Sequence, residues 1–344
     1  MRQSGGIWRR SVVVGAALAV LFGVVGVPKG WAQDLERTKI RLGYMPIAEE
    51  TPKFVAYELA LFKKRGLEVE MVRFESGPDM GTALLGGSIQ VGMIGTPGMI
   101  NAAVAGRPLI YLYDNGTNVK GPQGHEYFTG LVVLEGSPIK DIGDLKGKKV
   151  ALNVLKTNSE VQTVMQVERW NREHPDRRID LTNDVRFTTM PFGSMLAALE
   201  RGLVDAASLL EPYTTQMLSR HKIRIISPVS YALEDWPVSL GVARRDFAEN
   251  HVNTLKAYKA TWFEAVRWIR ENSAEAKKIM SKYTGMPADV ASRSVLPTWG
   301  EDLQSVRDRS SKIMDAMVRN KMLPKAIDLS TVIIEDPSTL KPKR

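Results

Sequence analysis

The sequence predicts an α/β fold in which two α/β lobes face a shared ligand cleft. One stretch occurs twice, at residues 83–98 and 198–213. Strands and helices alternate around both copies, and two intervening segments have the composition of crossovers between lobes. Ligands of open parallel sheets bind beyond the carboxyl ends of the strands. One such unit in each lobe therefore predicts a cleft between the lobes.

The duplicated stretch has the same features in both copies. A helix end containing Ala-Leu is followed by a glycine, Gly87 or Gly202, which can close the helix in the left-handed conformation. A short apolar run then predicts a strand, and a polar residue followed by proline comes next: Thr96 in the first copy and Glu211 in the second. Because proline favours the first turn of a helix, these two residues stand where N-caps stand. We expect them to face each other across the cleft.

Residues 1–32 have the layout of an export signal. Arg9 and Arg10 precede an apolar run, and small residues up to Ala32 have the spacing of a cleavage site. Glycines and a proline interrupt the run, which favours a removed signal over a membrane anchor. The arginine pair leaves both Sec and twin-arginine export open. Removing these residues takes away four basic side chains, so the net charge falls from +9 to +5.

The composition excludes several classes of protein. The 344 residues, 44% hydrophobic and 25% charged, are typical of a soluble globular chain with room for two domains. The absence of cysteine excludes disulfides, thiolate metal sites and a lipid-anchoring cysteine. The mildly basic charge includes no dense Lys/Arg stripe, so no nucleic-acid partner is predicted. We expect a monomer that is free in the periplasm.

The first lobe is predicted to comprise residues 33–130. Its strands are expected at 39–43, 67–74, 89–95 and 109–113, with helices at 51–65 and from the Thr96 corner to Gly106. Such alternation predicts a parallel sheet with helices on its faces. The Gly/Asn/Pro-rich segment 114–130 is the first crossover candidate.

The second lobe is predicted at residues 131–236. Its strands are expected at 131–134, 149–154, 185–189, 204–210 and 223–226, and its helices at 158–172 and 191–201. Residues 237–330 return to the first lobe with a strand at 236–243 and helices near 250–271, 274–283, 288–295 and 303–320. The aromatics of the first of these helices, Trp262 among them, are expected to be core. Residues 331–344 are expected to form a tail, frayed at its end.

Four motifs in this order resemble the periplasmic solute-binding proteins of nitrate/sulfonate/taurine-type ABC importers. They are residues 56–69, the turn at 87–92, residues 137–151 and residues 198–213. The resemblance spans residues 38–325. It implies a type II periplasmic-binding fold, two α/β lobes around a ligand cleft joined by two crossovers, which delivers a small-molecule ligand to an ABC permease in the inner membrane. It implies neither catalysis nor a cofactor.

The resemblance also places ligand contacts at the strand ends. They are Tyr44, Met45, Pro46, Thr96, Pro97, Asn158, Ser159 and Glu211, and we add Ser76, Gly77 and Trp236 as further candidates. Thr96 and Ser159 could instead serve only as helix caps. Glu211 is favoured at a helix start by the helix dipole, yet facing a cleft it would pair with an amine or N–H donor of a ligand. Trp236 could stack on a planar ligand.

Two other functions remain open beside the sulfonate-, taurine- or nitrate-binding importer component. These are an importer component for a planar heterocycle such as a thiamine-pyrimidine precursor, and a ligand-binding partner of a membrane sensor. An enzyme is the rival class, and it is not predicted. The four histidines stand in separate segments without metal-ligand spacing, so no metal site or catalytic group is predicted. His125-Glu126 is expected to be a solvated loop. A related pyrimidine-synthesising branch depends on a cysteine-rich motif, which this chain lacks.

Overall fold

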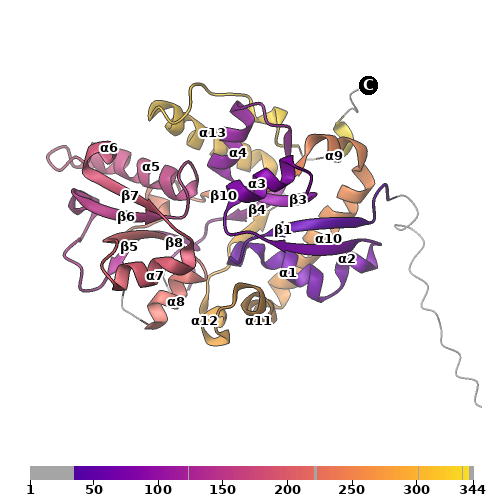
Figure 1. Ribbon diagram of the computed structural model, residues 1–344, viewed down its shortest axis with the longest axis horizontal. Helices are drawn as coiled ribbons and strands as arrows, with labels where there is room; N and C mark the ends of the chain where they lie inside the picture. Colours follow the sequence, from indigo (N-terminus) through magenta and orange to yellow (C-terminus); the bar gives the residue numbers. More distant parts are fainter. Residues whose placement is uncertain (1–34, 123, 221–222, 301, 335, 341–344) are drawn as a thin grey trace, which may run out of the picture.

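The computed structural model describes residues 35–340, except positions 123, 221–222, 301 and 335. These residues form two α/β lobes that lie side by side (Figure 1). Each lobe is built on its own sheet, and no described strand belongs to both. The predicted export signal and the last four residues lie outside the described part of the chain.

The first lobe contains a six-stranded mixed sheet. Across the sheet the strands are β11 (Thr298–Gly300), β4 (Leu109–Thr117), β10 (Pro237–Arg244), β3 (Val91–Gly95), β1 (Lys39–Tyr44) and β2 (Glu68–Arg73). β1 pairs in parallel with β2 and β3, but β10 runs antiparallel to β3 and β4. The prediction of a parallel sheet is therefore wrong, because the strand that returns from the other lobe enters in the opposite direction.

Helices flank this sheet and supply most of its core. They are α1 (Thr51–Glu58), α2 (Leu61–Lys64), α3 (Gly77–Leu85), α4 (Thr96–Val104), α9 (Arg245–Asn250), α10 (Val252–Glu271), α11 (Ser273–Thr284), α12 (Ala288–Arg293) and α13 (Leu303–Arg319). The rings of Tyr258 and Trp262 in α10 are fully buried and lie 6.1 and 4.3 Å from the ring of Tyr113 in β4. The prediction that the aromatics of this helix are core is confirmed for Trp262, whereas Phe263 and Trp268 are partly buried against the same core.

The second lobe contains a five-stranded sheet. Its order is β7 (Val185–Thr189), β6 (Lys148–Leu152), β8 (Ala206–Leu210), β5 (Phe128–Leu134) and β9 (Ile223–Ser227). The helices are α5 (Asn158–Glu173), α6 (Leu181–Asp184), α7 (Phe192–Glu200) and α8 (Tyr213–Arg220). β5 pairs antiparallel with β8 and β9, starting from Phe128. The second sheet thus begins at Phe128, before the lobe boundary predicted at residue 131.

Two segments connect the sheets. Residues 118–127 lead from β4 to β5, and residues 228–236 lead from β9 to β10. The second segment includes the 3-10 turn η3 (Val229–Tyr231); the others are η1 (Ala48–Glu50), η2 (Ile142–Leu145), η4 (Leu329–Thr331) and η5 (Pro337–Thr339). Because both ends of the second lobe are connected to the first lobe, a movement of one lobe relative to the other requires these two segments to bend as a hinge.

The helix predicted at residues 51–65 is divided. Ala60 has φ 52°, in the left-handed region, and it separates α1 from α2. The change of direction allows Phe62 of α2 to be buried with its ring stacked 5.8 Å from that of Tyr258. Tertiary packing thus overrides a helical pattern that continues through the break.

The predicted tail at 331–344 is also corrected in its first part. The Tyr111 amide of β4 donates to the Val332 carbonyl, and the Ile334 amide donates to the Tyr111 carbonyl, each at 2.9 Å. Ile333 between them is fully buried. These residues therefore extend the edge of the first lobe.

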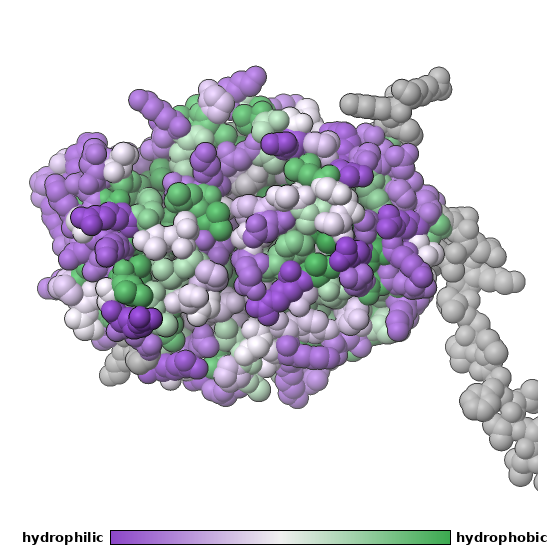
Figure 2. Space-filling view, viewed as in Figure 1, coloured by the Kyte–Doolittle hydropathy of each residue, from purple (hydrophilic) through white to green (hydrophobic). Residues whose placement is uncertain are grey.

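The surface of the described chain is predominantly polar. Figure 2 shows hydrophilic residues around the outline of one face and smaller groups of hydrophobic residues nearer its middle. Among the described helices, none is both long and apolar enough to cross a membrane.

Candidate functional site

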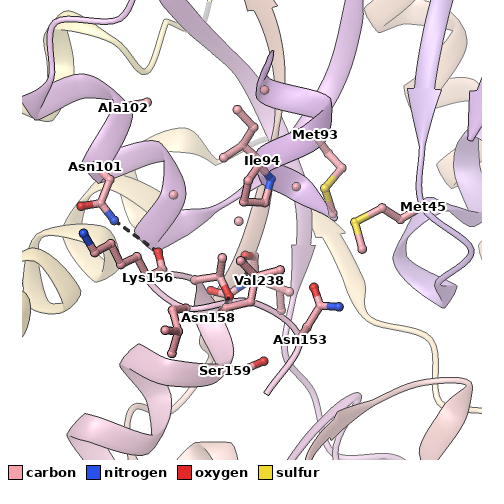
Figure 3. Close-up of a pocket in the computed structure, with 18 of the residues that line it drawn as sticks. Met45, Met93, Ile94, Asn101, Ala102, Asn153, Lys156, Asn158, Ser159 and Val238 are labelled. Carbon is pink, nitrogen blue, oxygen red and sulfur yellow. Dashed lines mark hydrogen bonds between the residues drawn. The ribbon is translucent and has the colours of Figure 1, made fainter. Parts of the chain in front are cut away.

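A cavity of about 780 Å³ lies between residues of the two lobes. The first lobe supplies η1, α3, β3 and α4, and the second supplies the β6–α5 loop together with residues of β5, α7 and β8. Figure 3 shows Met45 and Met93 on one side, and Asn153 and Ser159 across from them. The apolar part of the wall is formed by Met45, Ile47, Met93, Ile94, Phe128, Phe192, Leu210 and Val238. This volume and this mostly apolar lining are typical of small-molecule sites.

Two helices, one from each lobe, begin at this cavity. α4 starts after Gly95, and α5 starts after Thr157, and both of these N-cap positions line the cavity. Neither N-cap makes a side-chain hydrogen bond to its helix. Gly95 has no side chain, and the Thr157 hydroxyl donates instead to the Val154 carbonyl at 2.6 Å. The first amides of both helices are therefore not capped by these side chains, and helix N-termini of this kind favour anions.

A third helix, α3, also begins at the cavity, but its N-terminus is capped. The Ser76 hydroxyl accepts from the Asp79 amide at 3.3 Å and donates to the Asp79 carboxylate at 2.6 Å. An acidic group thus already occupies the first turn of α3. This N-terminus is less suited to an anion than that of α4, whose first turn contains no acidic residue. The first turn of α5 contains Glu160, but that helix has no side-chain cap.

The structure brings four of the eleven predicted contact residues to the cavity wall. These are Met45, Gly77, Asn158 and Ser159. The other seven are placed behind or beside the wall: Tyr44, Pro46, Ser76, Thr96, Pro97, Glu211 and Trp236. Ser159 is nearly fully buried, with 1% of its surface exposed, and it stands in the first turn of α5.

Trp236 lies behind Asn158 and holds it in place. The fully buried indole donates from Nε1 to Asn158 Oδ1 at 3.0 Å, and Asn158 Nδ2 donates to the Val238 carbonyl at 2.8 Å. A Cβ atom built on Gly95 would come 2.8 Å from Asn158 Nδ2, so the lobes approach closely here. Asn158 thus joins the start of α5 to the returning strand of the first lobe.

Thr96 stabilises the same region rather than facing the cavity. Its side chain is fully buried, and its hydroxyl donates to the Pro237 carbonyl at 2.5 Å. A second contact between the lobes lies nearby, since Asn101 of α4 donates to the Lys156 carbonyl at 3.2 Å (Figure 3). The corner after β3 is therefore fixed to both lobes.

Glu211 is fully buried in a polar network away from the cavity. Its Oε1 lies 2.5 Å from His125 Nε2 and accepts from the Thr215 hydroxyl at 2.8 Å. The expectation that His125-Glu126 forms a solvated loop is wrong, because the exposures of the two residues are 4% and 7%. Glu126 accepts from Asn118 and from the Ser230 amide, so it connects the two crossovers.

The acidic residue of the cavity lining is Glu49, which was not among the predicted contacts. It stands in η1, directly after the predicted Tyr44–Pro46 loop, and it is fully buried. The pKa of its carboxyl is raised to about 8, chiefly by burial and to a smaller extent by the negative charge of Glu50, while hydrogen bonds from Ser239 and Tyr127 and the charge of Lys53 act in the opposite direction. Two adjacent acids at the carboxyl end of the first strand were the available sequence signal.

No group of three or more histidine and carboxylate side chains in the described part of the chain could hold a metal ion. Two cationic residues, Arg107 and Lys156, belong to the cavity lining, and both are exposed to solvent.

Comparison with known proteins identifies relatives over most of the chain. The sequence model of the NMT1-like family matches residues 33–284. A protein of Escherichia coli (strain K12), named for binding aliphatic sulfonates, is 28% identical over 275 residues, which cover 78% of this chain and 81% of that protein. The nitrate/nitrite binding protein NrtA of Nostoc sp. is 27% identical over 280 residues, covering 76% of this chain and 62% of its own length.

A solved structure agrees with the fold. The periplasmic aliphatic sulphonate binding protein SsuA from Escherichia coli superposes with a TM-score of 0.69 at 26% identity, over 87% of this chain and 93% of that one. The predicted type II periplasmic-binding fold with two α/β lobes is thus confirmed.

Proposed function

This chain belongs to the NMT1-like family, and on that premise we propose that it is the substrate-binding component of an ABC importer. The observation that carries the proposal is the cavity between the two lobes, at which α4 and α5 both begin without a side-chain hydrogen bond from their N-cap residues. A ligand held by both helices would join the lobes. Binding proteins of two-lobed architecture close around ligands by hinge movement.

The lining supports a ligand that is an organic anion. Helix N-termini favour a negatively charged group, and the methionine, isoleucine and phenylalanine side chains would cover an apolar portion. A cavity of about 780 Å³ is far larger than nitrate or bicarbonate requires. We therefore place an alkanesulfonate-like molecule ahead of these small inorganic anions.

The remaining parts of the proposal follow from the family and the sequence. The chain is exported, loses its signal near Ala32, acts as a monomer in the periplasm and delivers its ligand to a permease in the inner membrane. It performs no chemistry on the ligand. Relatives named for sulfonate and nitrate binding support this role.

A direct binding panel tests the proposal. The chain from Gln33 onward is mixed with ethanesulfonate, propanesulfonate, taurine, nitrate or bicarbonate, and its thermal unfolding and heat of binding are measured. A ligand at a hundredfold excess over its Kd stabilises the native state by about 2.7 kcal/mol, so binding raises Tm. Conversion of a bound compound by the isolated protein, or no binding of any sulfonate, would contradict the proposal.

A further inference from the structure

A second cavity, of about 280 Å³, lies where α5 of the second lobe meets α13 of the first. Figure 1 shows these two helices along the same side of the molecule. The cavity shares no lining residue with the larger one between the lobes. Its lining is mostly charged and comprises Met165, Glu168, Arg169, Arg172, Ala232, Lys312, Asp315 and Arg319. Four cations, two from each lobe, thus stand against two acids.

The carboxylate of Glu168 does not balance the cations around it. Arg319 of α13 donates from Nε and Nη2 to its two oxygens, at 3.1 and 3.2 Å, across the junction between the lobes. Arg172 Nη1 lies 3.5 Å from the same carboxylate, and Arg172 makes no hydrogen bond within the described part of the chain. A guanidinium has five N–H donors. Arg172 therefore supplies free donors from the second lobe.

Lys312 is the corresponding free cation of the first lobe. Its ammonium makes no hydrogen bond or ion pair with any residue that the structure describes, and its side chain is exposed. Asp315, the other acid of the lining, interacts electrostatically with Arg319. Arg169 is paired outside the cavity lining, since its Nε donates to Glu173 at 2.8 Å. Lys312 thus retains its full charge and all three of its donors.

We propose that this cavity binds a small, multiply charged oxyanion between Arg172 and Lys312, and that the anion thereby joins the two lobes. A guanidinium presents paired N–H groups that fit an oxyanion, and a lysine ammonium adds a point charge with freely placed donors. Phosphate and sulfate share the required chemistry. A volume of about 280 Å³ is sufficient for such an ion together with bridging water molecules. This site does not depend on the proposed function.

An anion that is held from both lobes favours the arrangement in which α5 and α13 are close. Ala232 of the lining belongs to the second crossover, so the site also lies beside one of the segments that must bend when the lobes move. Under the proposed function, a ligand in the larger cavity favours the same arrangement. The two ligands should therefore strengthen each other's binding, by the same factor in both directions. Only this coupling rests on the proposed function.

Titration calorimetry with inorganic phosphate tests the site, at low and constant ionic strength because salt screens exposed charges. The double variant Arg172→Gln with Lys312→Gln should weaken phosphate binding by roughly tenfold or more, because both anchoring cations are lost. Arg178→Gln with Lys325→Gln is the matched control, since it removes one exposed cation after α5 and one after α13, both outside the cavity lining. This control should bind phosphate as the wild type does. All four side chains are exposed, so both variants are expected to fold.

Several results would overturn the proposal. Equal weakening in the two double variants would show a dependence on net charge alone, and competition between phosphate and propanesulfonate would place the anion in the larger cavity. Absence of phosphate binding by the wild type would also overturn it, including the case in which a glutamate-rich peptide binds instead and identifies a protein-docking surface.

The coupling has its own measurement. Phosphate should raise the affinity of the wild type for propanesulfonate by roughly fivefold or more, and this gain should be absent from Arg172→Gln with Lys312→Gln. An unchanged affinity would overturn the bridging of the lobes by the anion. If propanesulfonate itself does not bind, the proposed function fails, while the phosphate titrations of the two double variants still decide whether the oxyanion site exists.

Discussion

At the scale of single residues, the site depends on half-buried and buried polar side chains that are held by specific hydrogen-bond partners. Asn158 is the clearest case, since its amide contacts both Trp236 and the Val238 carbonyl. Unsatisfied buried polar groups are costly, which makes each partner important for the stability of the corner. The same argument explains why Thr96 and Glu211 are satisfied within the protein.

Trp236→Phe tests the hydrogen bond to Asn158. We expect a loss of unfolding free energy about 1–3 kcal/mol greater than that for Trp262→Phe, because Asn158 Oδ1 is left without its donor. Trp262 is an apt control, since it is also fully buried but its Nε1 has no hydrogen-bond partner among the described residues. Urea denaturation of both variants measures the difference, and equal losses would contradict the prediction.

Glu49 should also make the ligand-free protein less stable as pH rises. Its carboxyl has a folded-state pKa of about 8 against 4.5 for an ordinary glutamate, so between these values only the folded state retains the proton. Unfolding free energy should therefore decrease with pH by at most about 1.4 kcal/mol per pH unit in this window. The stability that the protonated carboxyl contributes is present in full below pH 4.5 and is lost as the pH rises through 8.

Glu49→Gln removes this dependence, so denaturant unfolding of wild type and variant from pH 5 to 8 isolates it. Asp114, with a pKa raised to about 6 by burial, acts in the same direction in both proteins and cancels in the comparison. Parallel pH profiles for the two proteins would show that Glu49 is ionised throughout.

At the scale of elements, the duplicated helix–strand–helix unit explains where the cleft forms. Gly87 and Gly202 have φ 73° and 66°, so both close a helix in the left-handed conformation as the sequence predicted. β3 and β8 then lead to α4 and, through Glu211 and Pro212, to α8. Only the first corner lines the cavity directly, through Gly95 and Gly98; in the second lobe this role belongs mainly to the start of α5.

Two substitutions at the start of α5 test whether an anion binds there. Thr157→Asp places a carboxylate at the N-cap, where it would take the free amides and repel an anion; Thr157→Asn caps the helix without charge. We expect propanesulfonate affinity to fall at least roughly tenfold further for Asp than for Asn, a difference of about 1.4 kcal/mol. Calorimetry on the two variants checks this, and equal affinities would argue against an anion at α5.

Sequence patterns could predict the elements and the corner positions because these depend on local spacing. The two glycines, the returning strand and the aromatic face of α10 are examples. The contacts of Glu49, Glu211 and His125 could not be predicted, because each partner lies far away in the chain and is brought close only when the lobes assemble. The antiparallel direction of β10 could not be predicted either, because it depends on how the chain re-enters the first sheet after the second lobe.

At the scale of the whole molecule, hydrogen bonds around the cavity join lobes that also share a hydrophobic cluster. Three hydrogen bonds connect the two lobes: Asn158 to Val238, Asn101 to Lys156, and the Tyr213 hydroxyl to the Pro46 carbonyl. An ion pair between Arg319 of α13 and Glu168 of α5 adds another bridge, at 3.1 Å, but its exposed position limits its contribution. Opening would break these bonds, and a ligand would favour their formation.

Fluorescence energy transfer can measure this movement. The chain lacks cysteine, so Tyr57→Cys in α1 and Leu203→Cys in the second lobe, both exposed positions, provide a labelling pair across the lobes. We expect propanesulfonate to shift the transfer efficiency of this pair. A pair within one lobe, Leu203→Cys with Leu218→Cys, should not respond; if neither pair changes, binding does not move the lobes.

β10 can complete the first sheet only after the second lobe has been synthesised. This strand lies between β3 and β4 in the middle of the first sheet, although its residues follow the whole second lobe in sequence. During synthesis the second lobe is therefore complete while the first sheet still lacks an inner strand. A chain truncated before Pro237 would retain one finished lobe and leave the edges of β3 and β4 open to association with other chains.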